Sequence, residues 1–236
     1  MFYGNIYQNI LKMKNSILIS VLLVALFEIQ ARTLPGTTKV FNPFNTFYAE
    51  GTEYVFTGSE NFINWIGSKP GGRHNGTLNI TEGKISVTGK VVSAGNFKFD
   101  LNTIKDLDLE NPGSNAKLVG HLKSADFFDV NKFPFAGFEI VSVKSVRSTA
   151  VVKDGEVATN SEVTGNLTIK GITKSITFPA RIILEKNVVT VTANPFPINR
   201  TSWGVNYQSK SIFAELKDKF IYDEIILSFN LKFSKK

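Results

Sequence analysis

The sequence predicts an all-β fold, an antiparallel barrel of about eight strands with one short helix. The first observation is a strict alternation of apolar and polar residues, typical of strands with one wet and one dry face. The alternation is clearest in four segments: 76–81, 96–102, 165–171 and 226–233. The second observation is that turn-forming residues separate the alternating segments. A sheet of this size closes into a barrel, which leaves no exposed edge.

The predicted strands follow one another along the chain. Their expected positions are near 53–69, 74–81, 84–92, 95–105, 135–148, 157–170, 173–185 with 187–198, and 221–234. Hairpin turns are expected at 81–84 (TEGK), 153–156 (KDGE) and 184–187 (LEKN), because Gly, Asp and Asn adopt the backbone angles that tight turns need. The glycine-rich segment 68–76 (SKPGGRHNG) is interpreted as a further hairpin turn, at the rim of the barrel.

Residues 114–124 are the single helical candidate. Leu118, Val119 and Leu122 recur at helical spacing, and Ser114 or Asn115 is the expected N-cap. After the helix we expect a turn rich in phenylalanine and then a strand that begins near residue 135.

The composition narrows the classes of function. The chain has 236 residues, a net charge of +7, no cysteine and two histidines. Without cysteine there is no disulfide framework, thiolate nucleophile or cysteine-based metal site. The basic residues are spread thinly and the aromatic ones fall on the apolar faces of strands, so we do not expect a nucleic-acid partner. No cluster of metal-ligating residues accompanies His74 or His121 in the sequence, so neither metal nor cofactor is expected.

The sequence gives little support for catalysis. A triad of Ser124, His121 and Asp126 can be written down, but the nucleophile-elbow pattern G-x-S-x-G is missing. The glycines near residue 71 lack the strand-to-helix setting of a phosphate-binding loop. We therefore expect a protein that is not an enzyme.

The N-terminal segment has the features of a secretory signal peptide. Residues 16–27 form an apolar run, preceded by Lys12 and Lys14 and followed by a small residue at Ala31. The run is shorter than the roughly 20 residues that span a bilayer. We predict a signal peptide over 1–31, with Met13 as an alternative start, and an uncleaved anchor as the other interpretation. The expected protein is periplasmic or secreted and has no membrane span after cleavage.

Residues 32–50 are predicted to be a lead-in, and residues 51–236 a single barrel domain. The apolar strand faces of this domain carry large side chains, and the whole chain contains 20 Phe. Two interpretations remain open: the side chains fill the barrel as a core, or they line a cavity that holds an apolar tail. In the second, the expected wall residues are Ile63, Trp65, Leu78, Ile80, Phe97, Phe99, Leu101, Phe138, Ile140, Leu167, Ile169, Phe178, Leu227 and Phe229, with Trp203 and Tyr207 near the mouth.

A polar rim is the expected contact for an anionic head group. Its candidates are Lys69, Arg73 and His74 of the hairpin, together with His121 of the predicted helix.

Four segments of the chain resemble one known family. The segments are LVGHLKSADFFDVNKFPFAGFEIVSV (118–143), VTGNLTIKGITKSITFPARI (163–182), NWIGSKPGGRHNGTLNI (64–80) and INRTSWGVNY (198–207). In order and spacing they resemble the YceI-like family of bacterial polyisoprenoid-binding proteins, over residues 48–234. The hairpin at 64–74 and the longer lead-in depart from the family pattern, and both concern the head-group end of the barrel.

The resemblance implies an extended, lipocalin-like barrel of eight antiparallel strands with the helix beside its mouth. It also implies a long cavity for an isoprenoid or fatty-chain ligand, and a homodimer. Phe127 and Phe128, after the helix, would form a lip or plug and join the cavity wall.

The expected function is therefore the non-catalytic sequestration or carriage of a long-chain apolar ligand: a polyisoprenoid, an isoprenoid quinone or a fatty-chain lipid. One alternative is an enzyme or quinone-linked helper that acts on a bound isoprenoid. Another is a filled barrel that serves as a structural or interaction module.

Overall fold

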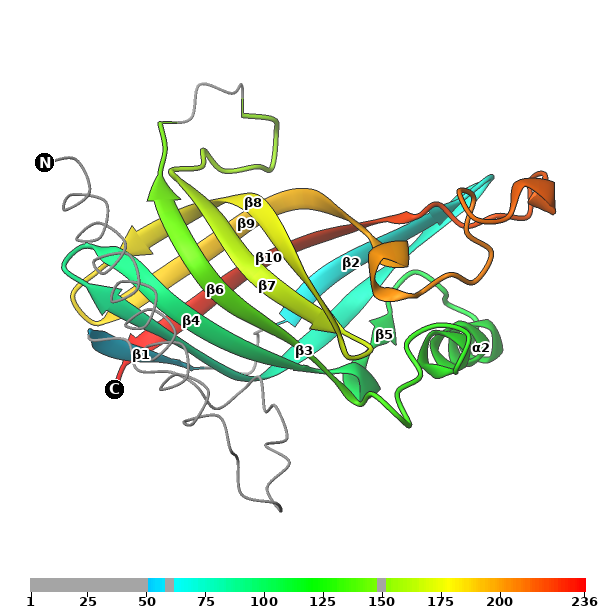
Figure 1. Cartoon of the computed structure of the whole chain (residues 1–236), viewed down its shortest axis with the longest axis horizontal. Coiled ribbons are helices and arrows are strands. Elements are labelled where there is room, and N and C mark those ends of the chain that lie inside the picture. The colour runs from blue at the N-terminus through cyan, green and yellow to red at the C-terminus, as the bar shows by residue number, and fades with distance from the viewer. Residues whose placement is uncertain (1–50, 58–61, 148–151) are drawn as a thin grey trace, which may run out of the picture. The chain divides into compact units, whose positions relative to one another are not determined.

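The computed structural model describes residues 51–57, 62–147 and 152–236. The predicted signal peptide (1–31) and lead-in (32–50) lie outside the described residues. The described part of the chain forms a closed, eight-stranded antiparallel barrel with one α-helix (Figure 1). The predicted fold class is confirmed.

The elements follow in chain order. They are β1 (Thr52–Phe56), β2 (Phe62–Lys69), β3 (Gly72–Thr88), β4 (Val91–Asp100), η2 (Leu101–Thr103), β5 (Lys105–Asp106), α2 (Pro112–Lys123), β6 (Phe135–Ser145), β7 (Ser161–Ile169), β8 (Ile172–Leu184), β9 (Val188–Asn199), η3 (Arg200–Trp203), η4 (Ala214–Leu216) and β10 (Glu224–Lys235).

The barrel closes through its C-terminal strand. Around the ring the order is β10, β2, β3, β4, β6, β7, β8 and β9, and β9 pairs again with β10. Strand β10 pairs with β2 along its first half and with β1 along its second half, as in the pair Tyr54 and Lys235. Strands β1 and β2 thus share one position in the ring, where the sequence predicts a single strand near 53–69.

The predicted turn at 81–84 is wrong, because β3 runs through these residues without a break. Its register against β4 shifts between Ile80 and Glu82, which marks a β-bulge. Glycine and acidic residues occur in bulges as well as in turns, so the sequence pattern fits both. The hairpin to β4 forms later, at Gly89, whose φ of +63° suits glycine. The predicted turn at 184–187 does connect two strands, β8 and β9.

The N-cap of helix α2 is Asn111, three residues before Ser114 and four before Asn115. The side chain of Asn111 caps it by accepting the N–H of Ser114, at 2.9 Å. Pro112 occupies the first turn, where the backbone N–H that proline lacks has no helical partner. The expected caps, Ser114 and Asn115, therefore lie inside the helix.

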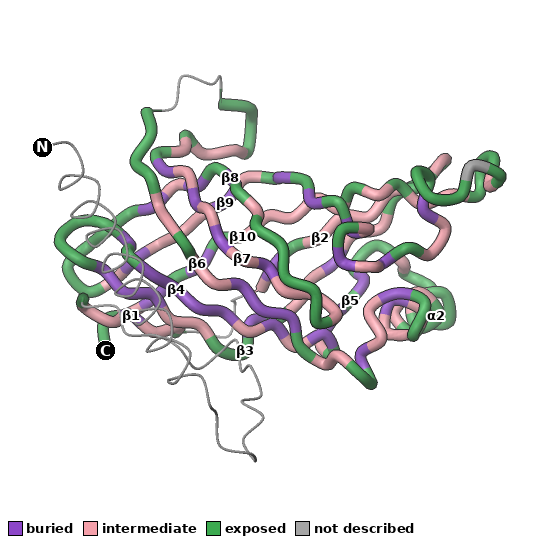
Figure 2. The backbone as a smooth tube through the Cα atoms, viewed as in Figure 1, coloured by how far each residue is buried: buried purple, intermediate pink, exposed green. Residues whose placement is uncertain are grey.

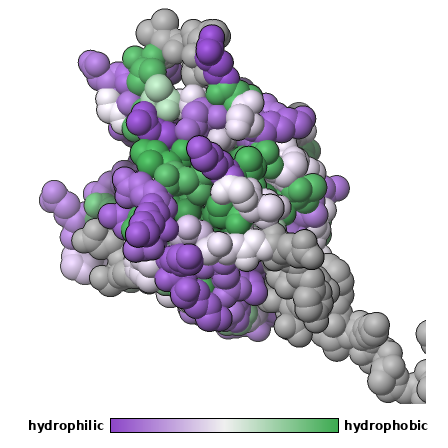
Figure 3. All heavy atoms as spheres, turned by 90° about the vertical axis from the view of Figure 1, so that its left-hand side faces the viewer, coloured by the Kyte–Doolittle hydropathy of each residue, from purple (hydrophilic) through white to green (hydrophobic). Residues whose placement is uncertain are grey.

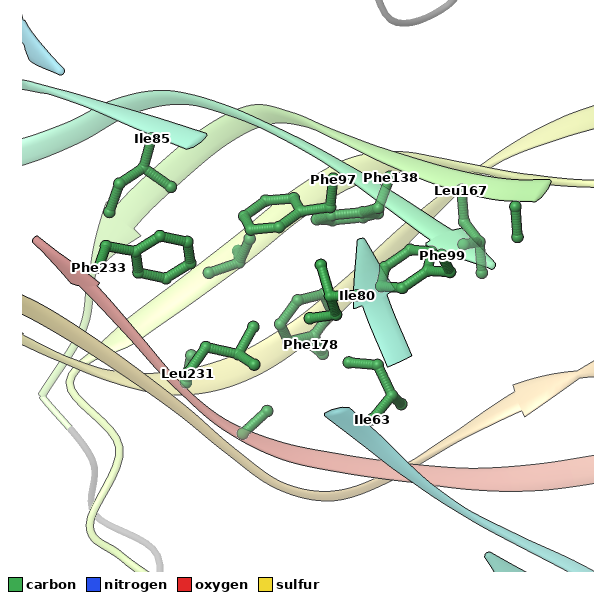
Figure 4. Packing of buried hydrophobic residues seen from close by; sticks show 14 of the residues in the cluster. Ile63, Ile80, Ile85, Phe97, Phe99, Phe138, Leu167, Phe178, Leu231 and Phe233 are labelled. Atoms are coloured by element: carbon green, nitrogen blue, oxygen red, sulfur yellow. The ribbon is translucent and has the colours of Figure 1, made fainter. Parts of the chain in front are cut away.

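The core lies inside the barrel. Along β7 every second residue from Ser161 to Leu167 is buried, and Figure 2 shows the same mixture of buried and more exposed residues along the other strands. In Figure 4 the labelled Phe97, Phe138 and Phe178 point from their strands into this interior.

The two ends of the barrel differ. Helix α2, η3 and η4 lie at one end, to the right in Figure 1. Figure 3 shows the other end, where hydrophobic residues gather and are framed by polar ones. No helix among the described residues has the length and apolar character needed to cross a membrane.

Candidate functional site: an apolar cavity in the barrel

The barrel contains a cavity of about 570 Å³ with a mainly apolar wall. Each of the eight strands contributes to the wall, since alternation turns every second side chain inward. One contributor from each strand is Ile63, Leu78, Phe97, Phe138, Leu167, Phe178, Phe196 and Phe229. A volume of this size lies within the range of about 300–1,000 Å³ that is typical of small-molecule sites.

Phenylalanine rings form a connected series along the cavity. Phe233 contacts Phe97 with ring centroids 5.8 Å apart, and Phe97 contacts Phe138 at 6.2 Å. Phe138 contacts Phe178 at 5.7 Å, and Phe178 stacks on Phe196 at 4.6 Å. Such ring pairs add stability beyond that of area burial alone, so this part of the wall is firmly packed.

Polar groups gather where the cavity meets α2 and the β2–β3 hairpin. Lys69 and His74 line the cavity from the hairpin, and His121 lines it from the helix. The imidazole of His121 packs edge-on against Tyr207, with centroids 4.4 Å apart, and against Phe127, at 5.6 Å. We call this end the mouth. The buried indole Nε1 of Trp65, which also lines the cavity, has no hydrogen-bond partner among the described residues.

A buried arginine holds the segment that forms one side of the mouth. Arg200 is 2% exposed and donates to the carbonyl oxygens of Val205 (2.7 Å), Ile221 (3.1 Å) and Tyr222 (3.2 Å). Its Nη2 also lies 3.6 Å from Asp223 Oδ1. These contacts tie η3 to the chain just before β10.

Burial lowers the pKa of the Arg200 guanidinium, and the charge of Asp223 partly opposes this effect. Burial also tends to raise the pKa of Asp223. Hydrogen bonds from Ser209 and Ser211 and the charge of Arg200 outweigh that tendency, so the pKa of Asp223 lies below its usual range. Asp223 is thus held as a carboxylate beside the guanidinium.

Most of the predicted wall residues line the cavity. All of those named from the sequence do so, Phe127, Phe128 and Tyr207 included, except Ile80 and Trp203. Ile80 lies beside the β-bulge and packs in the core at 6% exposure. Trp203 is 2% exposed, and its indole N–H is engaged by the carbonyl oxygen of Leu167 at 3.0 Å. For the residues that do line the cavity, a role in ligand binding stays a prediction.

Of the predicted rim residues, Lys69, His74 and His121 line the cavity and Arg73 does not. Arg73 is exposed, and it precedes His74 directly on β3, so alternation directs the two side chains to opposite faces.

Several wall residues were not predicted. Phe196 and Ile198 follow the same alternation as the predicted positions, so the pattern in β9 was sufficient to find them. Residues 218–222 also line the mouth, but they lie in an irregular segment without periodicity, and no sequence signal marks them.

The candidate triad does not assemble. His121 Nε2 lies 3.8 Å from Asp126 Oδ2. The hydroxyl of Ser124 donates to the backbone carbonyl of His121 at 2.8 Å, rather than to the imidazole. The contact between nucleophile and base that such catalysis uses is therefore not formed.

The fold does bring three metal-ligating residues together, which the sequence did not suggest. Donor atoms of His74, Asp106 and Asp108 lie within 4.8 Å of one another. Burial tends to raise the pKa of Asp108, but the N–H of Asn75 and the side chains of His74 and Asp106 hold it below its usual range. The cluster adjoins the mouth, because His74 also lines the cavity.

Solved structures share this fold at low sequence identity. A polyisoprenoid-binding domain from Saccharophagus degradans aligns with a TM-score of 0.55 and 15% identity, covering 78% of this chain and 98% of that one. BcnA from Burkholderia cenocepacia aligns with a TM-score of 0.53 and 17% identity, covering 72% and 94%.

Curated relatives match the chain in part. A UPF0312 protein of Enterobacter sp. (strain 638) is 36% identical over 108 residues, which are 46% of this chain and 48% of the relative. A protein YceI of Salmonella arizonae is 33% identical over a stretch of the same length and coverage. The chain thus spans about half the length of the curated relatives it matches. The profile of the YceI-like domain matches residues 54–233, nearly the whole barrel, and the chain therefore belongs to the YceI-like family.

Proposed function

We propose that this protein binds a long-chain apolar molecule in the barrel cavity and carries or sequesters it without chemical change. The observation that supports the proposal is the cavity of about 570 Å³, whose wall is apolar along all eight strands. A filled barrel would leave no such space. The domain from Saccharophagus degradans, which shares this fold, is named as polyisoprenoid-binding, and this name suggests the class of ligand.

Burial of the ligand supplies the affinity. Removing one CH₂ group from water contributes about 0.8 kcal/mol, so ten buried carbons contribute about 8 kcal/mol. Association costs of about 4 kcal/mol or more offset part of this. A long chain therefore binds measurably through its apolar part alone, whether it is a polyisoprenoid, an isoprenoid quinone or a fatty-chain lipid.

The mouth offers contacts for the polar end of such a ligand. Lys69, His74 and His121 supply positive or hydrogen-bonding groups, and the indole N–H of Trp65 is a buried donor. A donor that is buried without a partner favours a ligand that carries an acceptor. The proposed ligand accordingly has an oxygen-containing head group.

The proposed compartment is the periplasm or the extracellular space, which rests on the predicted signal peptide over 1–31. The homodimer stays a prediction, which sedimentation of the purified protein tests. For the alternative of catalysis on a bound isoprenoid, His121 is the candidate group, and the hydroxyl of Ser124 donates to its backbone carbonyl rather than to its imidazole.

Native mass spectrometry followed by organic extraction tests the proposal. The protein is purified from the host that produces it, and the expected result is a defined long-chain lipid or isoprenoid released in about equal molar amount. A second assay titrates the protein with a fluorescent fatty acid. Failure to bind both this probe and a set of isoprenoids and quinones would contradict the proposal.

A pair of variants locates the binding site. Leu78 lines the cavity and its neighbour Asn79 is exposed, so the two side chains occupy opposite faces of β3. Leu78→Trp fills part of the cavity and is expected to weaken probe binding at least about tenfold, which corresponds to about 1.4 kcal/mol. Asn79→Trp adds the same side chain outside and leaves binding unchanged. Equal effects of the two, at equal thermal stability, would place the ligand elsewhere.

A further inference from the structure

The residues His74, Asp106 and Asp108 form a group that the proposed lipid-binding function does not require. His74 is on β3, Asp106 is on the short strand β5, and Asp108 follows two residues later. The pairing of β5 with β3, which sets Asp106 opposite Gly76, brings residues 32 or more positions apart in sequence together. We call this group the His–Asp cluster.

Each aspartate uses one oxygen for the fold and directs the other to the imidazole. Asp108 Oδ1 accepts the N–H of Asn75 at 2.7 Å, and its Oδ2 lies 2.9 Å from His74 Nδ1. Asp106 Oδ1 accepts the N–H of Leu109 at 2.9 Å and the side-chain amide of Asn115 at 3.2 Å. Both carboxylates are thereby fixed in orientation, as the ligands in protein metal sites are.

The second oxygen of Asp106 is an independent indication of a ligand. The side chain of Asp106 has no exposed surface, and its Oδ2 is buried without a hydrogen-bond partner among the described residues. This oxygen lies 4.0 Å from His74 Nδ1, on the inner side of the His–Asp cluster. A buried carboxylate oxygen without a hydrogen-bond donor is costly, and a cation between the three side chains would relieve that cost.

We propose that the His–Asp cluster binds one divalent transition-metal ion, of which Zn²⁺ is the representative, through His74 Nδ1, Asp106 Oδ2 and Asp108 Oδ2. An imidazole nitrogen with carboxylate oxygens suits zinc and its neighbours rather than magnesium or calcium, which prefer oxygen alone. Bonds of about 2.0–2.1 Å to a tetrahedral ion place the donor atoms about 3.3 Å apart. The observed separations of 2.9 and 4.0 Å lie on either side of that value.

Three protein donors leave a tetrahedral ion one further position, which water or an anionic group fills. Because His74 also lines the cavity, the ion lies next to the mouth. Metal binding uses the lone pair of Nδ1, so the single N–H of the neutral imidazole would then lie on Nε2. The site does not depend on the proposed lipid ligand and is testable without it.

The test measures Zn²⁺ binding by the full chain, purified without a histidine tag, in competition with a chelating dye of known affinity. We expect one high-affinity Zn²⁺ per chain, and no competition from a large excess of Mg²⁺. His74→Gln and Asp108→Asn each remove one donor and are expected to lower the affinity at least about 100-fold, since even second-shell changes cost 10–100-fold. Both side chains are partly exposed, at 25% and 31%, so the substitutions leave the packing intact.

His121→Gln is the matched control. His121 also lines the mouth, has an aspartate 3.8 Å away and is 31% exposed, but belongs to no such three-residue group among the described residues. It should keep the wild-type affinity. At 100 times the dissociation constant, Zn²⁺ should raise the Tm of wild type and His121→Gln by about 5–10 °C, but not the Tm of His74→Gln or Asp108→Asn.

Two results would overturn the proposal. One is the absence of Zn²⁺ binding by the wild-type chain at micromolar concentration, which would leave the His–Asp cluster as an ion-pair network. The other is binding that His74→Gln and Asp108→Asn do not weaken, or that His121→Gln weakens equally.

Discussion

Arg200→Met should remove the main support of the mouth. The substitution leaves the carbonyl oxygens of Val205, Ile221 and Tyr222 without their donor, and Asp223 without its counter-ion. Hydrogen bonds from a charged donor contribute about 1.5–3 kcal/mol each, but water and side-chain movement recover part of the loss. Removing one member of a buried ion pair costs about 3–5 kcal/mol, and we expect a decrease in the free energy of unfolding within that range.

Urea unfolding followed by circular dichroism measures this decrease, with the m-value as a check on two-state behaviour. The corresponding fall in Tm is about 6–20 °C for a domain of this size. Arg200→Lys should recover only a small part, because one ammonium group cannot reach three carbonyl oxygens in the way that a planar guanidinium does. Arg73→Met, at an exposed position, should stay within about 0.5 kcal/mol of wild type.

The reasoning is refuted if Arg200→Met loses less than about 1 kcal/mol with an unchanged m-value, a loss typical of an ordinary substitution. That result would mean that packing, and not the guanidinium, holds the segment before β10. Asp223→Asn separates the two contributions. It keeps the three carbonyl contacts of Arg200 and should therefore cost clearly less than Arg200→Met.

Three further predictions concern pH, fluorescence and packing. The folded-state pKa of Asp223 is lowered, so its carboxylate stabilises the protein fully above the unfolded pKa of about 3.9, and this stability is lost as pH falls through the folded pKa. In urea titrations, the stability difference between wild type and Asp223→Asn should therefore shrink as pH falls from about 3.9. Trp65 lines the cavity and Trp203 is buried outside it, so binding of an apolar ligand should change the fluorescence of Trp203→Phe but not that of Trp65→Phe; the reverse pattern would place the ligand elsewhere. A Cβ at Gly165 would overlap a neighbouring ring and backbone, so Gly165→Ala should lower the free energy of unfolding by about 1–3 kcal/mol. Gly120 lies in open space on α2, so Gly120→Ala should raise it by about 0.5–1 kcal/mol. Thermal unfolding measures both changes. Equal effects of the two glycine substitutions would contradict the packing argument.

The alternation of the sequence was sufficient to predict the barrel, because each strand has one face toward the interior. It could not place strand ends where bulges intervene. The residues Glu82 and Gly83 look like a turn in isolation, yet pairing of β3 with both β1 and β4 keeps them in one strand. Long-range pairing decided between two local structures that the same residues allow.

The cavity wall was predictable for the same reason, and three of the four predicted rim residues also line the cavity. The burial of Arg200 and the His–Asp cluster were not predictable. Arginine usually lies at the protein surface. Arg200 is buried because carbonyl oxygens of residues up to 22 positions away accept its hydrogen bonds. His74 and Asp106 are separated in the sequence by the whole of β4, so no spacing rule joins them. Both features arise from contacts between segments that are separated in the sequence.

Strand β10 has a consequence for the order of events during synthesis. It pairs with β1, β2 and β9, and it is the last of the described strands to leave the ribosome. Until residue 224 has been made, three strands lack a partner along one edge, and unpaired edges readily join other chains. The barrel therefore cannot close before β10 has been made, and the interval between the synthesis of β9 and the docking of β10 is when aggregation, chaperones and proteases compete with folding.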